Sequence, residues 1–130
     1  SRYEIVMGAQ VNLDAGDPDR FIGMDGDQTT LVNSTSPYLV GVGRSVSSLR
    51  VVSANVLVGG QTMIFTVYRS ANNGASYAAI PGATATITAG NRAAGPVAFG
   101  PVALGSGDCI VVGIRVTGSD YNAGASAVIF

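Results

Sequence analysis

The chain has 130 residues and a net charge of −1, and only 12% of its residues are charged whereas 47% are hydrophobic. This length suits one domain with a sizeable core, and the charged share is about half of that in an ordinary soluble domain. All seven basic residues are scattered arginines. Nucleic-acid binding usually needs a basic excess or stripe, and membrane insertion needs a long apolar run, so neither is expected.

The first third of the chain is predicted to be rich in loops. Residues 2–7 alternate between apolar and polar side chains, which predicts a first strand. Residues 8–36 are polar and turn-rich and hold five of the eight acidic residues. We interpret them as a long ordered loop with one or two short strands, such as residues 29–32. Residues 37–43 predict a strand that begins after a proline.

Residues 62–69, read as Thr-Met-Ile-Phe-Thr-Val-Tyr-Arg, form the clearest predicted strand. Residues 48–58 predict the strand before it, and a break in their alternation near 53–55 predicts a bulge or a bend. The Gly59-Gly60 pair between the two predicts a hairpin turn, so that 62–69 would pair back on 48–58. Alternation divides 62–69 into two faces: Met63, Phe65 and Val67 on one, and Ile64, Thr66 and Tyr68 on the other.

The rest of the chain repeats short strands and glycine-rich turns. Residues 83–89 alternate alanine or isoleucine with threonine, which predicts a half-buried strand. Residues 95–104 contain two Gly-Pro-Val-Ala units, and Pro96 and Pro101 predict an edge or bulged strand. Residues 109–116 predict the most buried strand, and residues 125–130 predict a last one. The lone cysteine, Cys109, is expected to be a buried free thiol.

Eight closely spaced strands without a helical pattern predict an all-β fold. We predict a single domain over residues 1–130, an eight-stranded antiparallel jelly-roll β-sandwich. Residues 1–47 would supply the N-terminal strand and the long acidic loop, and residues 48–130 the core of the sandwich.

Residues 48–130 also carry a loose series of family features. Ser48-Leu49-Arg50-Val51 is followed by the Gly-Gly turn, the 65–69 strand with its Asn73-Gly74 turn, a threonine-rich strand, Gly107-Asp108 and a terminal Ala-Val-Ile-Phe. This order resembles the jelly-roll domains of the complement and tumour-necrosis-factor type. It is most similar to their bacterial and bacteriophage relatives on collagen-like stalks, virion fibres and capsid surfaces. The resemblance implies a compact trimer that acts as a structural or attachment module.

Four carboxylates of the acidic loop are the candidate metal ligands: Asp17, Asp19, Asp25 and Asp27. Calcium prefers several such oxygens on a flexible loop. Their spacing departs from the EF-hand pattern, and Asp and Gly are also ordinary turn residues, so a solvated loop without a cofactor is the main alternative.

Glycoside hydrolysis would need two acids across a cleft, and here the acids cluster on one loop. The chain has no His, which excludes a Ser-His or Cys-His nucleophile. We therefore expect no enzymatic activity.

Two further groups of residues are candidates for binding. Tyr77 and Tyr121 lie in predicted loops and could form a ligand surface, since exposed tyrosines suit sugars and proteins. A subunit interface is predicted at Ile64, Tyr68, Val111 and Phe130, because apolar outer faces usually mark contacts between subunits.

Together these features predict a non-enzymatic bacteriophage virion component, a capsid-decoration or fibre domain that forms a homotrimer. Its expected partners are its own copies and other virion or surface proteins, at the virion surface or an extracellular cell surface. The alternative is an attachment module that binds a receptor or a glycan.

Overall fold

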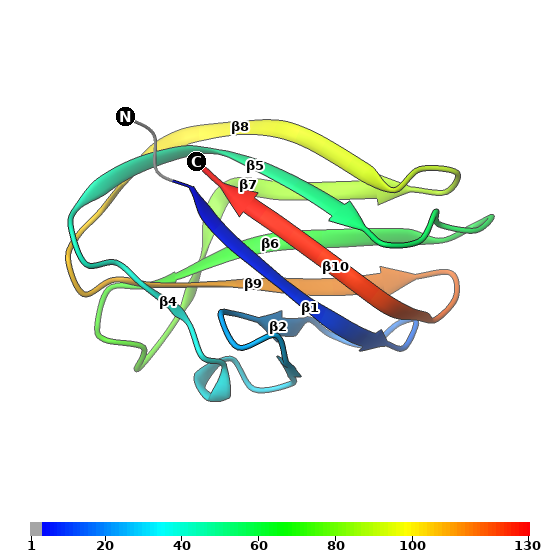
Figure 1. Ribbon diagram of the computed structural model, residues 1–130, viewed down its shortest axis with the longest axis horizontal. Helices are drawn as coiled ribbons and strands as arrows, with labels where there is room; N and C mark the ends of the chain where they lie inside the picture. The colour runs from blue at the N-terminus through cyan, green and yellow to red at the C-terminus, as the bar shows by residue number, and fades with distance from the viewer. Residues whose placement is uncertain (1–3) are drawn as a thin grey trace.

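A computed structural model describes residues 4–130 of the chain, Ser34 by its backbone alone, and shows an all-β fold (Figure 1). One short 3-10 helix, Val32–Ser34, interrupts the strands. The strands are β1 (Ile5–Leu13), β2 (Arg20–Ile22), β3 (Gln28–Thr29), β4 (Tyr38–Leu39), β5 (Arg44–Ser53), β6 (Thr62–Ser70), β7 (Ala78–Thr88), β8 (Ala93–Leu104), β9 (Cys109–Thr117) and β10 (Tyr121–Ile129). No helix in the described residues is long and apolar enough to cross a membrane.

The strands form two antiparallel sheets that pack face to face. The four-stranded sheet has the order β1-β10-β5-β8, and the six-stranded sheet has the order β3-β2-β9-β6-β7 with β4 beside β9. When the two-residue strands β3 and β4 are left out, eight strands remain, and we count them from 1 to 8 along the chain. In this count the four-stranded sheet has the order 1-8-3-6 and the other sheet has the order 2-7-4-5. This is the order of a jelly roll, in which the first strand pairs with the last. The predicted fold class is confirmed.

The core lies between the two sheets and follows the alternation of the strands. Met63, Phe65 and Val67 of β6 are fully buried, as the pattern predicts, and so are Ala83 and Ile87 of β7. The opposite side chains of β7, its threonines among them, are exposed. Strand β9 is buried on both faces from Cys109 to Ile114, so the prediction of a most buried strand is also confirmed.

The predicted hairpin between residues 48–58 and 62–69 is wrong. Strand β5 belongs to the four-stranded sheet and β6 to the six-stranded sheet, so the connection crosses from one sheet to the other. Buried Leu57 holds this connection: its N–H donates to the Asn91 carbonyl at 2.9 Å, and its carbonyl accepts from Gly90 N–H at 2.8 Å. The connection is therefore tied to the β7–β8 turn instead of folding back on β5.

Several predicted boundaries also differ from the structure. Strand β1 runs to Leu13, through residues expected to be a loop, and β10 begins at Tyr121 instead of residue 125. These two strands pair along their full length, from Ile5 with Ile129 to Leu13 with Tyr121, which extends both. In residues 37–43 only β4 is a strand. The predicted short strand at 29–32 is instead Thr29 at the end of β3, followed by the 3-10 helix. The part of the predicted first strand before residue 4 lies outside the described residues.

Strand β8 forms the edge of its sheet, as its prolines predict. The register between β5 and β8 shifts at two places, between Val46 and Ser48 and between Leu49 and Val51. The residues skipped on β8 at these places include Pro101 and Pro96, which have no N–H to donate. The bulged strand expected from Pro96 and Pro101 is thus present, and the backbone also bends at Ala54 and Asn55, directly after β5, where the break in alternation predicted a bulge or a bend.

Candidate functional site

The four candidate calcium ligands are spread over separate local contacts. Asp17 forms a partly buried ion pair with Arg20 at 3.4 Å, and the Asp25 carboxylate accepts the N–H of Asp27 at 3.2 Å within a turn. The Asp19 carboxylate accepts the hydroxyl of Tyr68 at 2.6 Å. Within residues 4–130 no three carboxylate, thiol or imidazole groups gather where they could hold a metal ion. The structure therefore does not assemble the predicted ligands into one site.

Asp19 and Tyr68 belong to a packed cluster on the outer side of the six-stranded sheet. The Phe21 ring meets the Tyr68 ring edge-on, with centroids 5.4 Å apart and planes at 76°. Gly113 lies beneath them, and a Cβ atom at this position would be only 2.8 Å from Asp19 Oδ2 and from Tyr68 Cε1. Burial, reinforced by the hydrogen bond with Asp19, raises the pKa of Tyr68 from 10.0 to about 12. This cluster holds the middle of the acidic segment, at β2, against the sheet.

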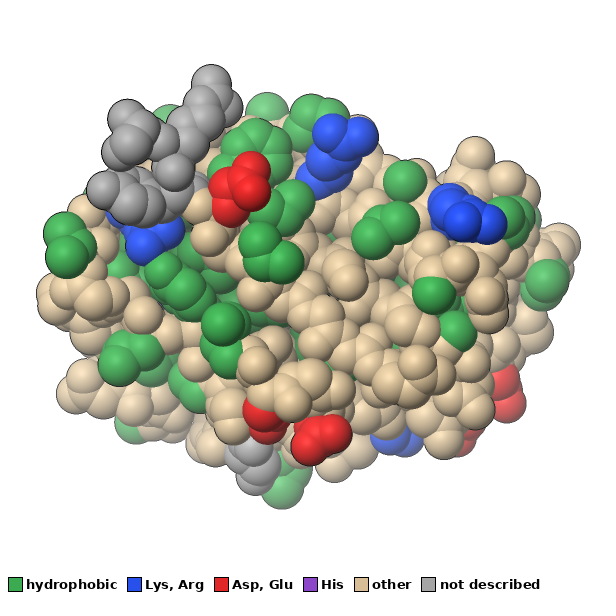
Figure 2. Space-filling model, in the orientation of Figure 1, with side chains coloured by type: hydrophobic (Ala, Val, Ile, Leu, Met, Phe, Trp, Pro, Cys, Tyr) green, Lys and Arg blue, Asp and Glu red, His purple; other side chains and the backbone are tan. Residues whose placement is uncertain are grey.

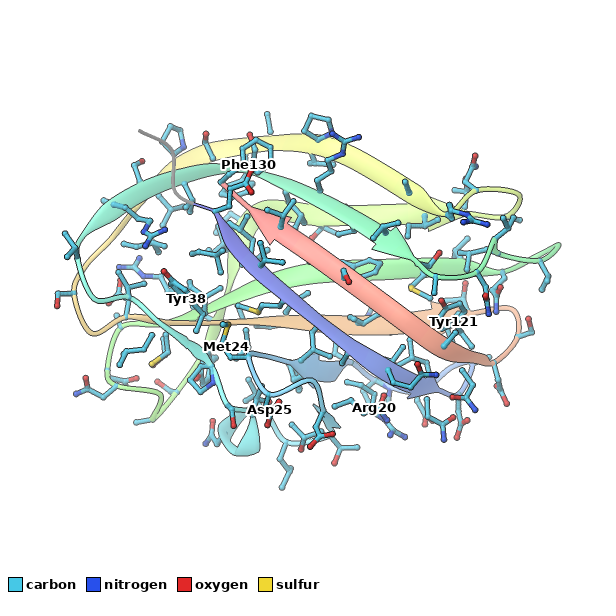
Figure 3. All side chains as sticks on the ribbon, viewed as in Figure 1. Arg20, Met24, Asp25, Tyr38, Tyr121 and Phe130 are labelled. Carbon is cyan, nitrogen blue, oxygen red and sulfur yellow. The ribbon has the colours of Figure 1, made fainter. Side chains whose placement is uncertain are left out.

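Tyr121 does not lie where the sequence predicted it. The prediction placed it in an exposed loop, but it is the first residue of β10 and is only 5% exposed. Its hydroxyl donates to the Gly124 carbonyl at 2.7 Å and accepts the N–H of Asn55 at 3.4 Å. Figure 3 shows it near the opposite end of β10 from Phe130. Tyr121 therefore closes one end of the core.

Tyr77 is half-buried and lies over Cys109, which is buried as expected. Burial raises the pKa of the Tyr77 hydroxyl, and the neighbouring Cys109 thiol adds to the rise. The hydroxyl is therefore turned inward.

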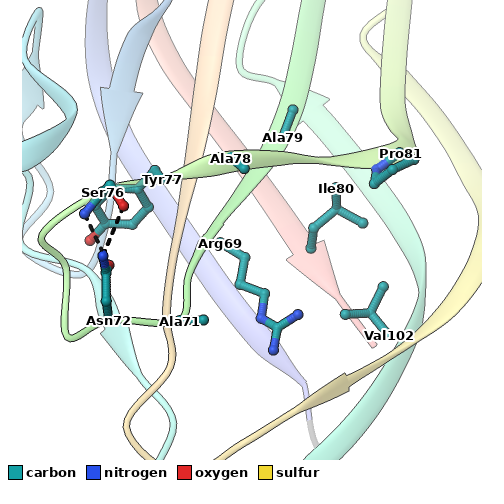
Figure 4. Close-up of a pocket in the computed structure, with 10 residues that line it drawn as sticks. All are labelled: Arg69, Ala71, Asn72, Ser76, Tyr77, Ala78, Ala79, Ile80, Pro81 and Val102. Carbon is teal, nitrogen blue, oxygen red and sulfur yellow. Dashed lines mark hydrogen bonds between the residues drawn. The ribbon is translucent and has the colours of Figure 1, made fainter.

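A hollow of about 440 Å³ opens beside Tyr77, between the β6–β7 loop, the start of β7 and the end of β8 (Figure 4). We call it the Arg69 hollow, since Arg69 is the one charged side chain among the residues that line it. Arg69 donates from Nε at 3.0 Å and from Nη2 at 2.9 Å to a single oxygen of Asp108, Oδ2. That oxygen also accepts the N–H of Gly105 at 2.8 Å. Because Asp108 is buried, the guanidinium group is held firmly in place.

The four predicted interface residues do not share one surface. Ile64 and Tyr68 are half-buried on the outer side of the six-stranded sheet. Alternation along β10 places Phe130, which is also half-buried, on the outer side of the four-stranded sheet. Its backbone is held by hydrogen bonds with Ser47 and Ser48.

Val111 was expected on an exposed outer face, and that expectation is wrong, since it is fully buried. Its outward neighbours on β9 are covered by other side chains. Cys109 lies under Tyr77, and Gly113 lies under Asp19 and Tyr68. Val111, between them, is therefore closed off from solvent.

Sequence reasoning missed the outer face of the four-stranded sheet, which no helix or strand of residues 4–130 covers (Figure 1). We define this open face by Val6, Gly8, Val52, Ser126 and Val128. The register pairs Val6 with Val128 and Ser126 with Val52 across neighbouring strands, and Val6 and Val52 are 56% and 42% exposed. In Figure 2 the middle of this side is mostly hydrophobic or uncharged, and the charged side chains lie toward its margins. The outward-facing valines on β1, β10 and β5 would indicate this face, but only once the order of the strands is known.

Comparisons with known proteins add little to this description. No protein-family model matches the sequence, and no curated protein matches it significantly. Among solved structures, that of Eiger TNF from S. frugiperda is similar at 12% identity, over 98% of this chain and 92% of its own, with a TM-score of 0.29. A likeness this weak carries no argument, so the jelly-roll fold rests on the strand order given above.

Proposed function

We propose that the chain is a non-enzymatic structural protein, a capsid-decoration or fibre domain of a bacteriophage virion that assembles as a homotrimer. The observation that supports this proposal is the open face. Apolar and small side chains, with exposed Arg50 beside them as the register partner of Val128, cover a sheet surface of a protein in which only 12% of the residues are charged, and contiguous apolar patches usually mark protein contacts. The sequence resemblance to trimeric virion and surface domains supplies the biological setting.

The virion setting is tested by following the protein in its source. An antibody raised against the folded chain should detect it in gradient-purified bacteriophage particles, and immunogold should label the particle surface. Detection in the particle-free supernatant alone would contradict a virion role.

A second candidate function is attachment, the binding of a receptor or a glycan. The observation that favours it is the Arg69 hollow, which combines a fixed charged group with polar and apolar walls. Small-molecule sites commonly have this composition and a volume of roughly 300–1,000 Å³. This function is compatible with the structural one, because the hollow and the open face lie on different elements.

A further inference from the structure

We propose that the Arg69 hollow binds a sugar acid, a monosaccharide that carries a carboxylate group. The inference rests on the attachment function proposed above and names its ligand class. Three features of the hollow carry it: a guanidinium group with an unused donor, a polar rim with a free hydroxyl proton, and an apolar wall.

The guanidinium group of Arg69 has donors left for a ligand. Nε and Nη2 are directed to Asp108 Oδ2, and Nη1 has no partner among the described residues. The side chain is 33% exposed, and Figure 4 shows it between the 71–76 loop and the side chains of Ile80 and Val102. The planar guanidinium group matches the geometry of a carboxylate or a phosphate, and the orientation fixed by Asp108 lowers the entropy cost of binding.

The charge balance favours a single carboxylate over a highly charged ligand. Arg69 is the one charged residue of the lining, and Asp108 already neutralises much of its charge. Attraction for an anion therefore comes mainly from directed hydrogen bonds. A dissociation constant in about the millimolar range is expected for one such contact with a small ligand.

The polar rim is supplied by Asn72 and Ser76. The Asn72 amide donates to Ser76 Oγ at 2.9 Å, and its carbonyl oxygen accepts the Ser76 N–H at 3.0 Å. The same oxygen accepts the Ser70 hydroxyl at 2.8 Å, so the loop is internally braced. The Ser76 hydroxyl is an acceptor in its bond with Asn72 and keeps its own proton for a ligand. A rigid rim of this kind suits the hydroxyl groups of a sugar.

The remaining wall is apolar and is formed by Ile80, Pro81 and Val102. A pyranose ring has a face of C–H groups that can pack on such a wall, with its hydroxyls directed to the rim. A simple inorganic anion would leave this wall unused. The hollow thus matches a ring with a carboxylate on one side better than it matches a free anion.

The test is an NMR titration of the ¹⁵N-labelled full chain with glucuronate and with glucose, which differ in the carboxylate. Glucuronate should shift the amide signals of residues 69–80 and 102 along a saturating curve, and glucose should bind about tenfold more weakly or worse. Equal shifts with both sugars would show that the carboxylate is not recognised. No saturating shift with glucuronate would overturn the proposal.

Two variants locate the site. Arg69→Lys keeps the charge but loses the planar donor and should weaken glucuronate binding about tenfold. Ala71→Tyr places an aromatic ring in the hollow, keeps Arg69 and Asp108 in the sequence, and should abolish the shifts. Ala89→Tyr, in the exposed turn after β7, is the matched control and should bind normally. Unchanged binding in the folded Ala71→Tyr protein would place the ligand elsewhere and refute the assignment.

The attachment function is tested separately with the same variants. If the intact protein binds host cells or glycans equally well with and without Ala71→Tyr, attachment stands but does not use this hollow. If neither protein binds cells or glycans while glucuronate still titrates into the hollow, the ligand class stands and attachment fails.

Discussion

Among single residues, Asp19 has the best-defined contact: its carboxylate accepts a hydrogen bond from the neutral hydroxyl group of Tyr68. Phe21 packs against the tyrosine ring, and Gly113 leaves the space for Asp19 and Tyr68. The sequence marks Asp19 as acidic and Tyr68 as outward-facing, but nothing in it links positions 49 residues apart. Alternation predicts the face of a side chain, whereas the partner depends on which strands become neighbours.

The first prediction concerns alkaline pH. The pKa of Tyr68 is 10.0 when unfolded and about 12 when folded, so the neutral hydroxyl stabilises the folded state. This contribution is complete below pH 10.0 and is lost as the pH rises toward about 12. Urea unfolding should therefore show the wild type losing stability across this range more steeply than Tyr68→Phe. Parallel declines of the two proteins would contradict the assignment.

The second prediction concerns Gly113. In Gly113→Ala the added methyl group collides with Asp19 and Tyr68, and we expect a loss of about 1–3 kcal/mol in the free energy of unfolding. Gly59→Ala is the control, because a Cβ at Gly59 would meet nothing within 4 Å. It should change stability by no more than about 0.5 kcal/mol. Equal effects in the two variants would mean that Gly113 is not needed for this contact.

At the element scale, the strands could largely be predicted from alternation and their connections could not. The predicted inner residues of β6 and β7 are buried, since a period of two directly reports a half-buried strand. The β5–β6 hairpin failed because Gly59-Gly60 is a local signal, whereas Leu57 anchors the connection to a turn more than 30 residues later. Strands β1 and β10 were predicted too short because long-range pairing extends each along the other.

The third prediction tests the role of β6 in the core. Phe65 is fully buried between the sheets, so Phe65→Ala should lower the free energy of unfolding by about 3–5 kcal/mol. The exposed outer side chain Thr86 on the neighbouring strand is the control, and Thr86→Ala should change stability by no more than about 0.5 kcal/mol. A loss below about 1 kcal/mol for Phe65→Ala would show that the site is not part of a packed core.

At the scale of the whole molecule, the two sheets present different outer faces. The six-stranded sheet carries threonines, with Thr66 paired to Thr84 and Thr62 paired to Thr117, whereas the four-stranded sheet carries the apolar open face. The predicted interface residues Ile64 and Tyr68 lie on the first of these faces, and only Phe130 lies on the second. The composition of the chain could indicate that an apolar surface exists. Which of the two sheets carries this surface depends on the strand order, which the composition does not give.

We propose above that copies of this chain assemble through the open face, and light scattering in dilute native solution measures the mass of that assembly. Wild type and Thr86→Asp, which adds a charge to the opposite sheet, should both have a mass of about three times 13.1 kDa. Val52→Asp, which adds the same charge to the open face, should fall to 13.1 kDa while remaining folded. A wild type of 13.1 kDa, or a Val52→Asp protein that keeps the wild-type mass, would rule out assembly through the open face.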